Sequence, residues 1–114
     1  MKFEPKKTTI DFEFTDKLIY KVDPKVAASK YKQIQELTSL NEEISKALTP
    51  EGLSDMCKNI RACIDMILEK GASKAIQPED NYNALEDIFL FLDYEIAKFQ
   101  KERLARIADE RKMI

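Results

Sequence analysis

The chain contains no histidine and no tryptophan, and only two glycines and two cysteines among its 114 residues. Without histidine, the side chain most often used for acid–base catalysis and metal binding is missing. Phosphate-binding loops need several glycines close together, whereas Gly52 and Gly71 are nineteen residues apart. No apolar run approaches the roughly 20 residues that a membrane-spanning helix requires. These absences argue against a metal site, a nucleotide-binding loop and a membrane protein.

The two cysteines are Cys57 and Cys63, six residues apart in a predicted helix. This spacing places them about 9 Å apart along the helix axis and on different faces. That separation is too large for a mutual disulfide, and two thiols without histidine are a poor zinc site. We expect reduced, partly buried thiols and no cofactor.

The overall composition, 44% hydrophobic and 35% charged, is typical of one helix-rich globular domain spanning residues 1–114. A formal charge of −2 argues against nucleic acid as a partner, because phosphate binding needs a strongly basic face. The N-terminal sequence MKFEPKKTT has no apolar segment behind its lysines, so we expect no signal peptide and a cytoplasmic location.

Apolar and polar residues alternate over residues 8–22, after a flexible leader at 1–7. The apolar positions of this period-two pattern are Ile10, Phe12, Phe14, Leu18, Tyr20 and Val22. With the polar turn at residues 15–17 between them, they predict a β-hairpin. Two strands alone are marginally stable, so the apolar face must lie on helices or pair with another chain. Their free edges offer a route to self-association.

Three helices are predicted after the hairpin, at residues 24–47, 50–70 and 81–112. Asp23-Pro24 and Thr49-Pro50 each combine a capping side chain with proline at the first helical position. Gly71 ends the second helix in a left-handed conformation, residues 72–77 can add one turn, and Asp80 or Asn81 caps the third helix. We therefore predict an α+β fold, predominantly α, in which the hairpin covers a small antiparallel bundle of three helices, the third one long.

The third helix changes character along its length. Its first part carries core residues at helical spacing: Leu85, Ile88, Phe89, Leu92, Ile96 and Phe99. Beyond Gln100 the apolar positions thin out among charged ones, which predicts an overhang at residues 101–114. A solvated, fraying helix end is one interpretation of this segment, and a partner-docking helix is the other.

Carboxylates are the only candidates for catalysis: Glu42, Glu43, Glu79, Asp80, Asp87, Asp93 and Glu95. Each occupies a position expected for a solvated helix face or a cap, and no histidine or glycine-framed nucleophile accompanies them. We expect no enzymatic activity.

Candidate partner-binding residues lie on the third helix. Phe91 and Tyr94 flank the core positions and can widen the apolar surface for a second chain. Further along, Leu104 and Ile107 are possible anchors, with Arg103 and Arg106 as a polar rim. The terminal residues 113–114 offer a small extra apolar contact.

Three segments carry a resemblance to a known family: IDFEFTDKLIYKV, CIDMILEKGASKAI and NYNALEDIFLFLDYEIAKF. In order and composition they resemble the tail assembly chaperones of long-tailed bacteriophages and prophages, over about residues 8–100. The resemblance implies a non-enzymatic protein of the bacterial host cytoplasm that binds the tape-measure and tail-tube proteins and forms homo-oligomers. It does not account for the charged segment after Gln100.

Two other functions remain open. A small cytoplasmic regulatory adaptor or antitoxin-like protein would dock on its partner through the charged C-terminal helix. A small enzyme is the third hypothesis, and the missing histidine, glycine loops and metal-ligand spacing all argue against it.

Overall fold

The structure is a computed structural model that describes residues 2 and 7–112. Its elements in chain order are β1 (Ile10–Thr15), β2 (Leu18–Val22), α1 (Pro24–Ser29), α2 (Tyr31–Ser45), α3 (Pro50–Ile67), α4 (Ala72–Ile76) and α5 (Tyr82–Lys112). The predicted α+β fold with an N-terminal hairpin is confirmed, but five helices follow the hairpin instead of three. Most of the predicted leader and the predicted contact of residues 113–114 lie outside the described residues.

The hairpin pairs β1 with β2 in antiparallel fashion, with Ile10 opposite Val22 and Phe12 opposite Tyr20. The Thr15 hydroxyl accepts hydrogen bonds from the two backbone N–H groups of Lys17 and Leu18, which fixes the turn. The predicted alternation is confirmed, because Phe12, Tyr20 and Val22 are buried while Ile19 on the opposite face is 54% exposed. The hairpin therefore lays one apolar face on the helices.

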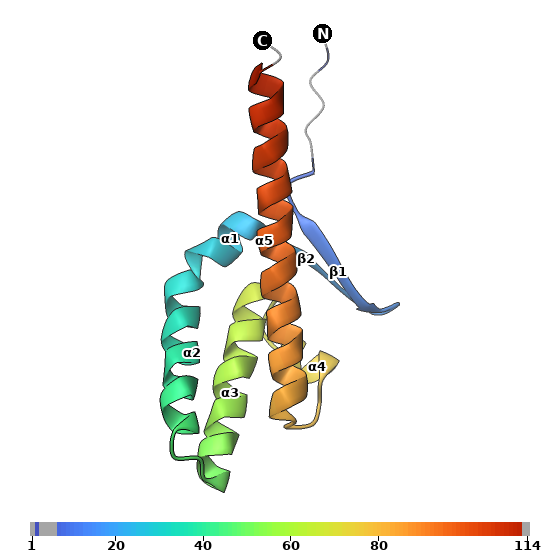
Figure 1. Cartoon of the computed structure of the whole chain (residues 1–114). Helices are drawn as coiled ribbons and strands as arrows, with labels where there is room; N and C mark the ends of the chain where they lie inside the picture. Colours follow the sequence, from blue (N-terminus) through green and yellow to red (C-terminus); the bar gives the residue numbers. More distant parts are fainter. Residues whose placement is uncertain (1, 3–6, 113–114) are drawn as a thin grey trace.

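The predicted helix over residues 24–47 is interrupted at Lys30. The Asp23 side chain caps α1 as expected, accepting a 2.9 Å hydrogen bond from the N–H of Lys25. At Lys30 the backbone has φ −95° and ψ −3°, and its N–H donates to the carbonyl of Ala27, three residues back. This tightened turn kinks the chain, so α1 covers the end of the bundle near the hairpin while α2 runs down along α3 (Figure 1).

Helix α3 begins at its predicted cap, where Thr49 accepts a hydrogen bond from the N–H of Gly52. It ends at Ile67, three residues before the predicted 70. Gly71 takes the predicted left-handed conformation, with φ 87°. The Asp65 carboxylate then accepts hydrogen bonds from the N–H groups of Gly71 and Ser73, which holds the start of α4 against α3.

The three main helices lie in a row with α3 in the middle, and α2 runs antiparallel to α3 (Figure 1). Helix α5 runs parallel to α3, so the predicted all-antiparallel bundle is wrong for this pair. The reason is the α4 segment, which carries the chain back toward the start of α3. Arg61 holds the returning loop, donating hydrogen bonds to the Asp80 carboxylate and to the Glu79 carbonyl. Asn81 then caps α5 through the N–H of Ala84.

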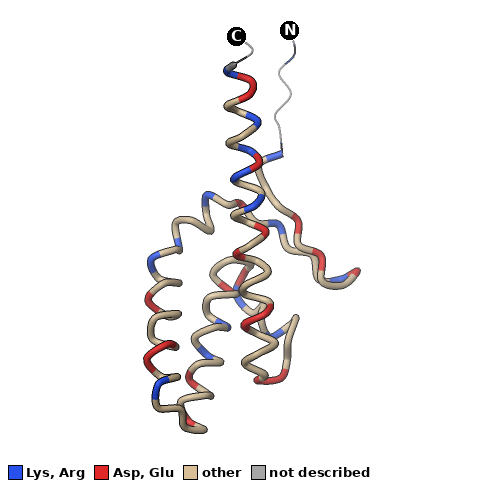
Figure 2. The backbone as a smooth tube through the Cα atoms, in the orientation of Figure 1, with Lys and Arg blue, Asp and Glu red and all other residues tan. Residues whose placement is uncertain are grey.

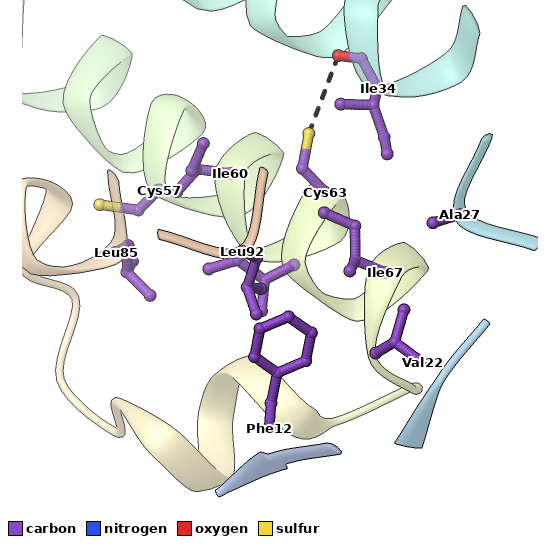
Figure 3. Packing of buried hydrophobic residues seen from close by; sticks show 11 residues of the cluster. Phe12, Val22, Ala27, Ile34, Cys57, Ile60, Cys63, Ile67, Leu85 and Leu92 are labelled. Atoms are coloured by element: carbon purple, nitrogen blue, oxygen red, sulfur yellow. Dashed lines mark hydrogen bonds between the residues drawn. The ribbon is translucent and has the colours of Figure 1, made fainter. Parts of the chain in front are cut away.

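The core forms where α3, α5 and the hairpin meet. Figure 3 shows Phe12 and Val22 of the hairpin pointing toward Leu92 and Ile67. The remaining buried apolar residues that surround them are Ala27, Ile34, Cys57, Ile60, Cys63, Ile64 and Leu85. Because this core lies toward one side of the row of helices, the side between α2 and α5 is left less covered.

Candidate helix-binding groove

A groove of about 1460 Å³ runs between α2 and α5 over α3, and Asp23 and Pro24, directly after the hairpin, line one end of it. It exists because α2 and α5 both pack on α3 but hardly touch each other. Its floor is apolar and includes Met56, Ile60 and Ile67 of α3. Two neighbouring helices with an open apolar seam between them form a surface of the shape that accepts a further helix.

The two walls of the groove differ, because α5 contributes several apolar side chains whereas α2 contributes mostly polar ones. On α5, Phe89 and Ile96 line the lower wall and Leu90, 54% exposed, stands at its margin. Opposite them, Tyr31 at the start of α2 is 62% exposed. Leu90 and Tyr31 are thus two exposed apolar side chains on opposite walls of one groove, where a single occupant could cover both.

The rim of the groove is more acidic than basic. The charged residues that line it are Asp23, Lys25, Glu42, Glu86, Asp93 and Arg103. Four of these six are acidic and stand on both walls, so the groove presents a negative rim around an apolar floor. This pattern favours an occupant with an apolar face bordered by lysine or arginine.

Three side-chain hydrogen bonds lie along the groove: two join α2 to α3, and the third lies within α5. Asn41 of α2 is buried; it donates a 3.2 Å hydrogen bond to the Met56 carbonyl and accepts one of 2.9 Å from Asn59. On the other wall Tyr82 donates a 2.9 Å hydrogen bond to Glu86. Burial, reinforced by that hydrogen bond to Glu86, raises the pKa of Tyr82 to about 12. The tyrosine therefore remains protonated and keeps this contact at physiological pH.

The groove offers little reactive chemistry. Within residues 2 and 7–112, no three His, Cys, Asp or Glu side chains gather closely enough to hold a metal ion. Asp80, one of the sequence candidates, is bound by Arg61 at 2.9 Å. The two free thiols are buried, and burial raises the pKa of Cys57 and that of Cys63, the latter to about 11. Protonated, buried thiols are poor nucleophiles.

Phe91 and Tyr94, predicted as partner-binding residues, do not line the groove. The ring of Phe91 meets that of Phe12 edge to face, with 5.9 Å between centroids, yet Phe91 remains 48% exposed. Tyr94 is 65% exposed. Phe91 thus helps to seat the hairpin, and the two aromatic side chains border a surface separate from the groove.

The other four predicted residues lie on the outer turns of α5, which project beyond the rest of the bundle (Figure 1). Leu104 is 58% exposed and Arg106 is exposed. Arg103 and Ile107 are half-buried, and Arg103 also lines the end of the groove. The structure therefore connects this segment to the groove through Arg103.

Five α5 residues that line the groove were not among the predicted partner-binding residues. They are Glu86, Leu90, Asp93, Ala97 and Gln100. A signal for them was present, because they recur at alternating four- and three-residue steps beside the core positions. Because some of these residues are polar, the spacing of apolar residues alone does not reveal this second stripe.

Comparison of the chain with protein-family models, with curated proteins and with solved structures finds no match. Throughout the described part of the chain, no helix combines the length and apolar character needed to cross a membrane.

Proposed function

We propose that this protein is a non-enzymatic interaction protein that binds an amphipathic helix of a client protein in the groove between α2 and α5. The groove itself carries the proposal, because its apolar floor lies between two helices held apart by their common contact with α3. A helix laid on it would turn the open row of three helices into a four-helix packing. Anchors at i, i+3, i+4 and i+7 of the client would face the floor.

The acidic rim defines the chemistry of the client further. Glu42 on one wall and Glu86 and Asp93 on the other flank the apolar floor. A client helix with lysine or arginine on both borders of its apolar face would pair with them, which favours specificity and association rate more than affinity.

The phage resemblance assigns the client. Under this proposal the protein is a tail assembly chaperone of the host cytoplasm, and the client helices belong to the tape-measure protein, with tail-tube subunits as second partners. Long helical clients offer many similar amphipathic segments, which suits a small protein with one open groove. Genes for tube and tape-measure proteins beside the gene of this chain would support the assignment.

The test is co-purification of the full chain with the product of a tape-measure gene, where one lies beside the gene of this chain. Leu90→Gln places a polar group on the groove wall, and Leu53→Gln does the same on α3 outside the groove, at 41% exposure. We expect Leu90→Gln to reduce the recovered complex and Leu53→Gln to leave it unchanged. Equal binding by both variants, or no complex with the native chain, would contradict the proposal.

A second candidate function, a regulatory adaptor or antitoxin-like protein, is favoured by the projecting outer turns of α5 and their exposed Leu104. It predicts one specific complex that is lost when residues 101–114 are deleted and retained in Leu90→Gln. The chaperone proposal predicts that Leu90→Gln weakens client binding.

A further inference from the structure

The outer turns of α5 continue the helix beyond the rest of the bundle (Figure 1). We call residues 101–112 the overhang. Leu104 is 58% exposed, and none of the overhang side chains that the structure describes is buried. Helical stability in proteins comes mainly from packing of an apolar face, so binding of this face to another molecule would stabilise the overhang.

One stripe of α5 joins the groove to the overhang. Its members follow one another at alternating four- and three-residue steps: Glu86, Leu90, Asp93, Ala97, Gln100, Leu104, Ile107 and Arg111. The first five line the groove. Since residues at this spacing share one helix face, Leu104 and Ile107 point to the same side of α5 as the groove wall.

Charge is distributed unevenly along the same helix. Residues 82–97 carry four acidic and no basic side chains, whereas residues 98–112 carry six basic and three acidic ones. Figure 2 shows the change from red positions on the lower turns of α5 to a mixture with many blue ones above. The helix macrodipole favours this order of charges only in the terminal turns, and it does not account for Asp93, Lys98 or Lys101 in the middle.

We infer that a second copy of the chain fills the groove, and that its α5 lies antiparallel to the first. Antiparallel pairing sets the acidic half of each α5 against the basic half of the other, twice in a symmetric dimer. If the two-fold axis passes between residues 98 and 99, each residue of the stripe lies opposite a stripe residue of the partner copy. Leu90 then meets the partner copy's residue 107, Glu86 meets its residue 111, and each overhang lies along residues 85–96 of the other chain.

The groove fits this occupant in size and charge. The groove, at about 1460 Å³, is a long open cleft of the kind that a helical occupant requires. Glu42 on the α2 wall stands where the basic side of the entering helix would pass. On the overhang, Arg111 belongs to the stripe and Arg103 borders it, so both can reach the acidic rim, whereas Arg106 lies on the opposite face of the helix.

Such a dimer would occupy the surface assigned above to the client. The inference therefore adds a regulatory step, in which a client helix displaces the partner's overhang, and it rests on the proposed function for that step alone. The dimer itself requires no client, so the two ideas can fail separately.

Disulfide trapping tests the register directly. Leu90 and Ile107 are about 26 Å apart along one helix, so a disulfide between cysteines at these positions can form only between chains. We expect mild oxidation of the full-length double variant Leu90→Cys/Ile107→Cys to give a covalent dimer in high yield. Each single variant should give none, because like positions lie far apart in an antiparallel pair. The native Cys57 and Cys63 are buried and do not compete.

Three results would overturn the inference. The double variant could cross-link no better than the single ones, or a single variant could cross-link with itself, which would indicate parallel pairing. Light scattering of the native full-length chain provides the third test, independent of any substitution. We expect twice the mass of one chain at high concentration and a shift toward the monomer when salt is raised. A strict monomer at every concentration contradicts the dimer.

A client added to the native chain separates the two proposals. If the dimer forms and a client peptide with a basic-bordered apolar face converts it to a one-to-one complex, both stand. A dimer that does not respond to the tape-measure protein supports the inference and contradicts the proposed function. Client binding by a protein that stays monomeric at every concentration supports the proposed function and contradicts the dimer.

Discussion

The two halves of α5 form one continuous helix but have opposite surroundings. Residues 82–97 press Leu85 and Leu92 into the core, where neither side chain is exposed. Residues 98–111 contribute no buried side chain, and Leu104 there is 58% exposed. Helical sequence preference runs through both halves, so the difference comes from α3, which covers only the first. Local sequence sets the length of this helix, whereas its neighbours decide which part is core.

Among the substitutions that test this difference, one that creates a cavity in residues 82–97 should have the largest effect. Leu92→Ala removes a fully buried side chain from the centre of the core, and we expect the free energy of unfolding to fall by about 2–5 kcal/mol. Urea unfolding at low protein concentration measures it. A loss below about 1 kcal/mol would contradict the assignment of this half to the core.

Alkaline pH should loosen the core on which residues 82–97 pack, because Cys63 of α3 belongs to the same buried cluster as Leu85 and Leu92. Burial of Cys63 raises its pKa from 9.0 to about 11, so the folded chain keeps a proton that the unfolded chain releases. The resulting stabilisation is complete below pH 9 and is lost as the pH rises to about 11. We expect a loss of up to about 3 kcal/mol over that window.

Urea unfolding of the native chain and of Cys63→Ala across this pH range tests the expectation. The variant should be less stable at neutral pH but should show a shallower fall with pH. Tyr82, whose pKa burial raises from 10.0 to about 12, adds a loss between pH 10 and about 12 in both proteins. The same slope in both would contradict the role of the thiol.

A third test concerns the loop before α5, which Arg61 holds and which positions residues 82–97. Arg61→Ala removes the hydrogen bonds to Asp80 and to the Glu79 carbonyl, and we expect a loss of about 2 kcal/mol. Lys58→Ala, an exposed position on the same helix, is the matched control and should change stability by less than about 0.5 kcal/mol. Similar losses in both variants would mean that Arg61 does not hold the loop.

The smallest effect is expected in the second half. Leu104→Ala should change the stability of the dilute protein by less than about 0.5 kcal/mol, because the side chain packs on little of its own chain. At high concentration the same substitution should weaken self-association, measured by light scattering. A loss comparable to that of Leu92→Ala in dilute solution would show that the second half belongs to the core of one chain.

Much of the fold could be predicted from local signals. Asp23, Thr49 and Asn81 each cap the helix expected from the sequence, and Gly71 takes the left-handed conformation that only glycine adopts freely. The kink at Lys30 has no such signal, since neither proline nor glycine is present there. The parallel course of α3 and α5 depends on Arg61 binding a loop nineteen residues away, a contact that periodicity does not encode.

The candidate site was less predictable than the fold. The overhang residues Leu104 and Ile107 could be chosen because an apolar pair among charges is visible in sequence. The groove wall could not, because Leu90 becomes a surface residue only when α2 is held away from α5. Phe91 was predicted to bind a partner, but its ring contacts Phe12 of the hairpin, and such a long-range contact is not visible in the spacing of residues within α5.

Amide hydrogen exchange of the full-length chain at several concentrations tests the central claim, that the groove side of α5 takes up a helix from a second copy. Residues 82–97 should exchange slowly at every concentration, because their protection comes from the core. Residues 101–112 should be protected in concentrated solution and exchange rapidly after dilution. Rapid exchange of the overhang at all concentrations would contradict the account.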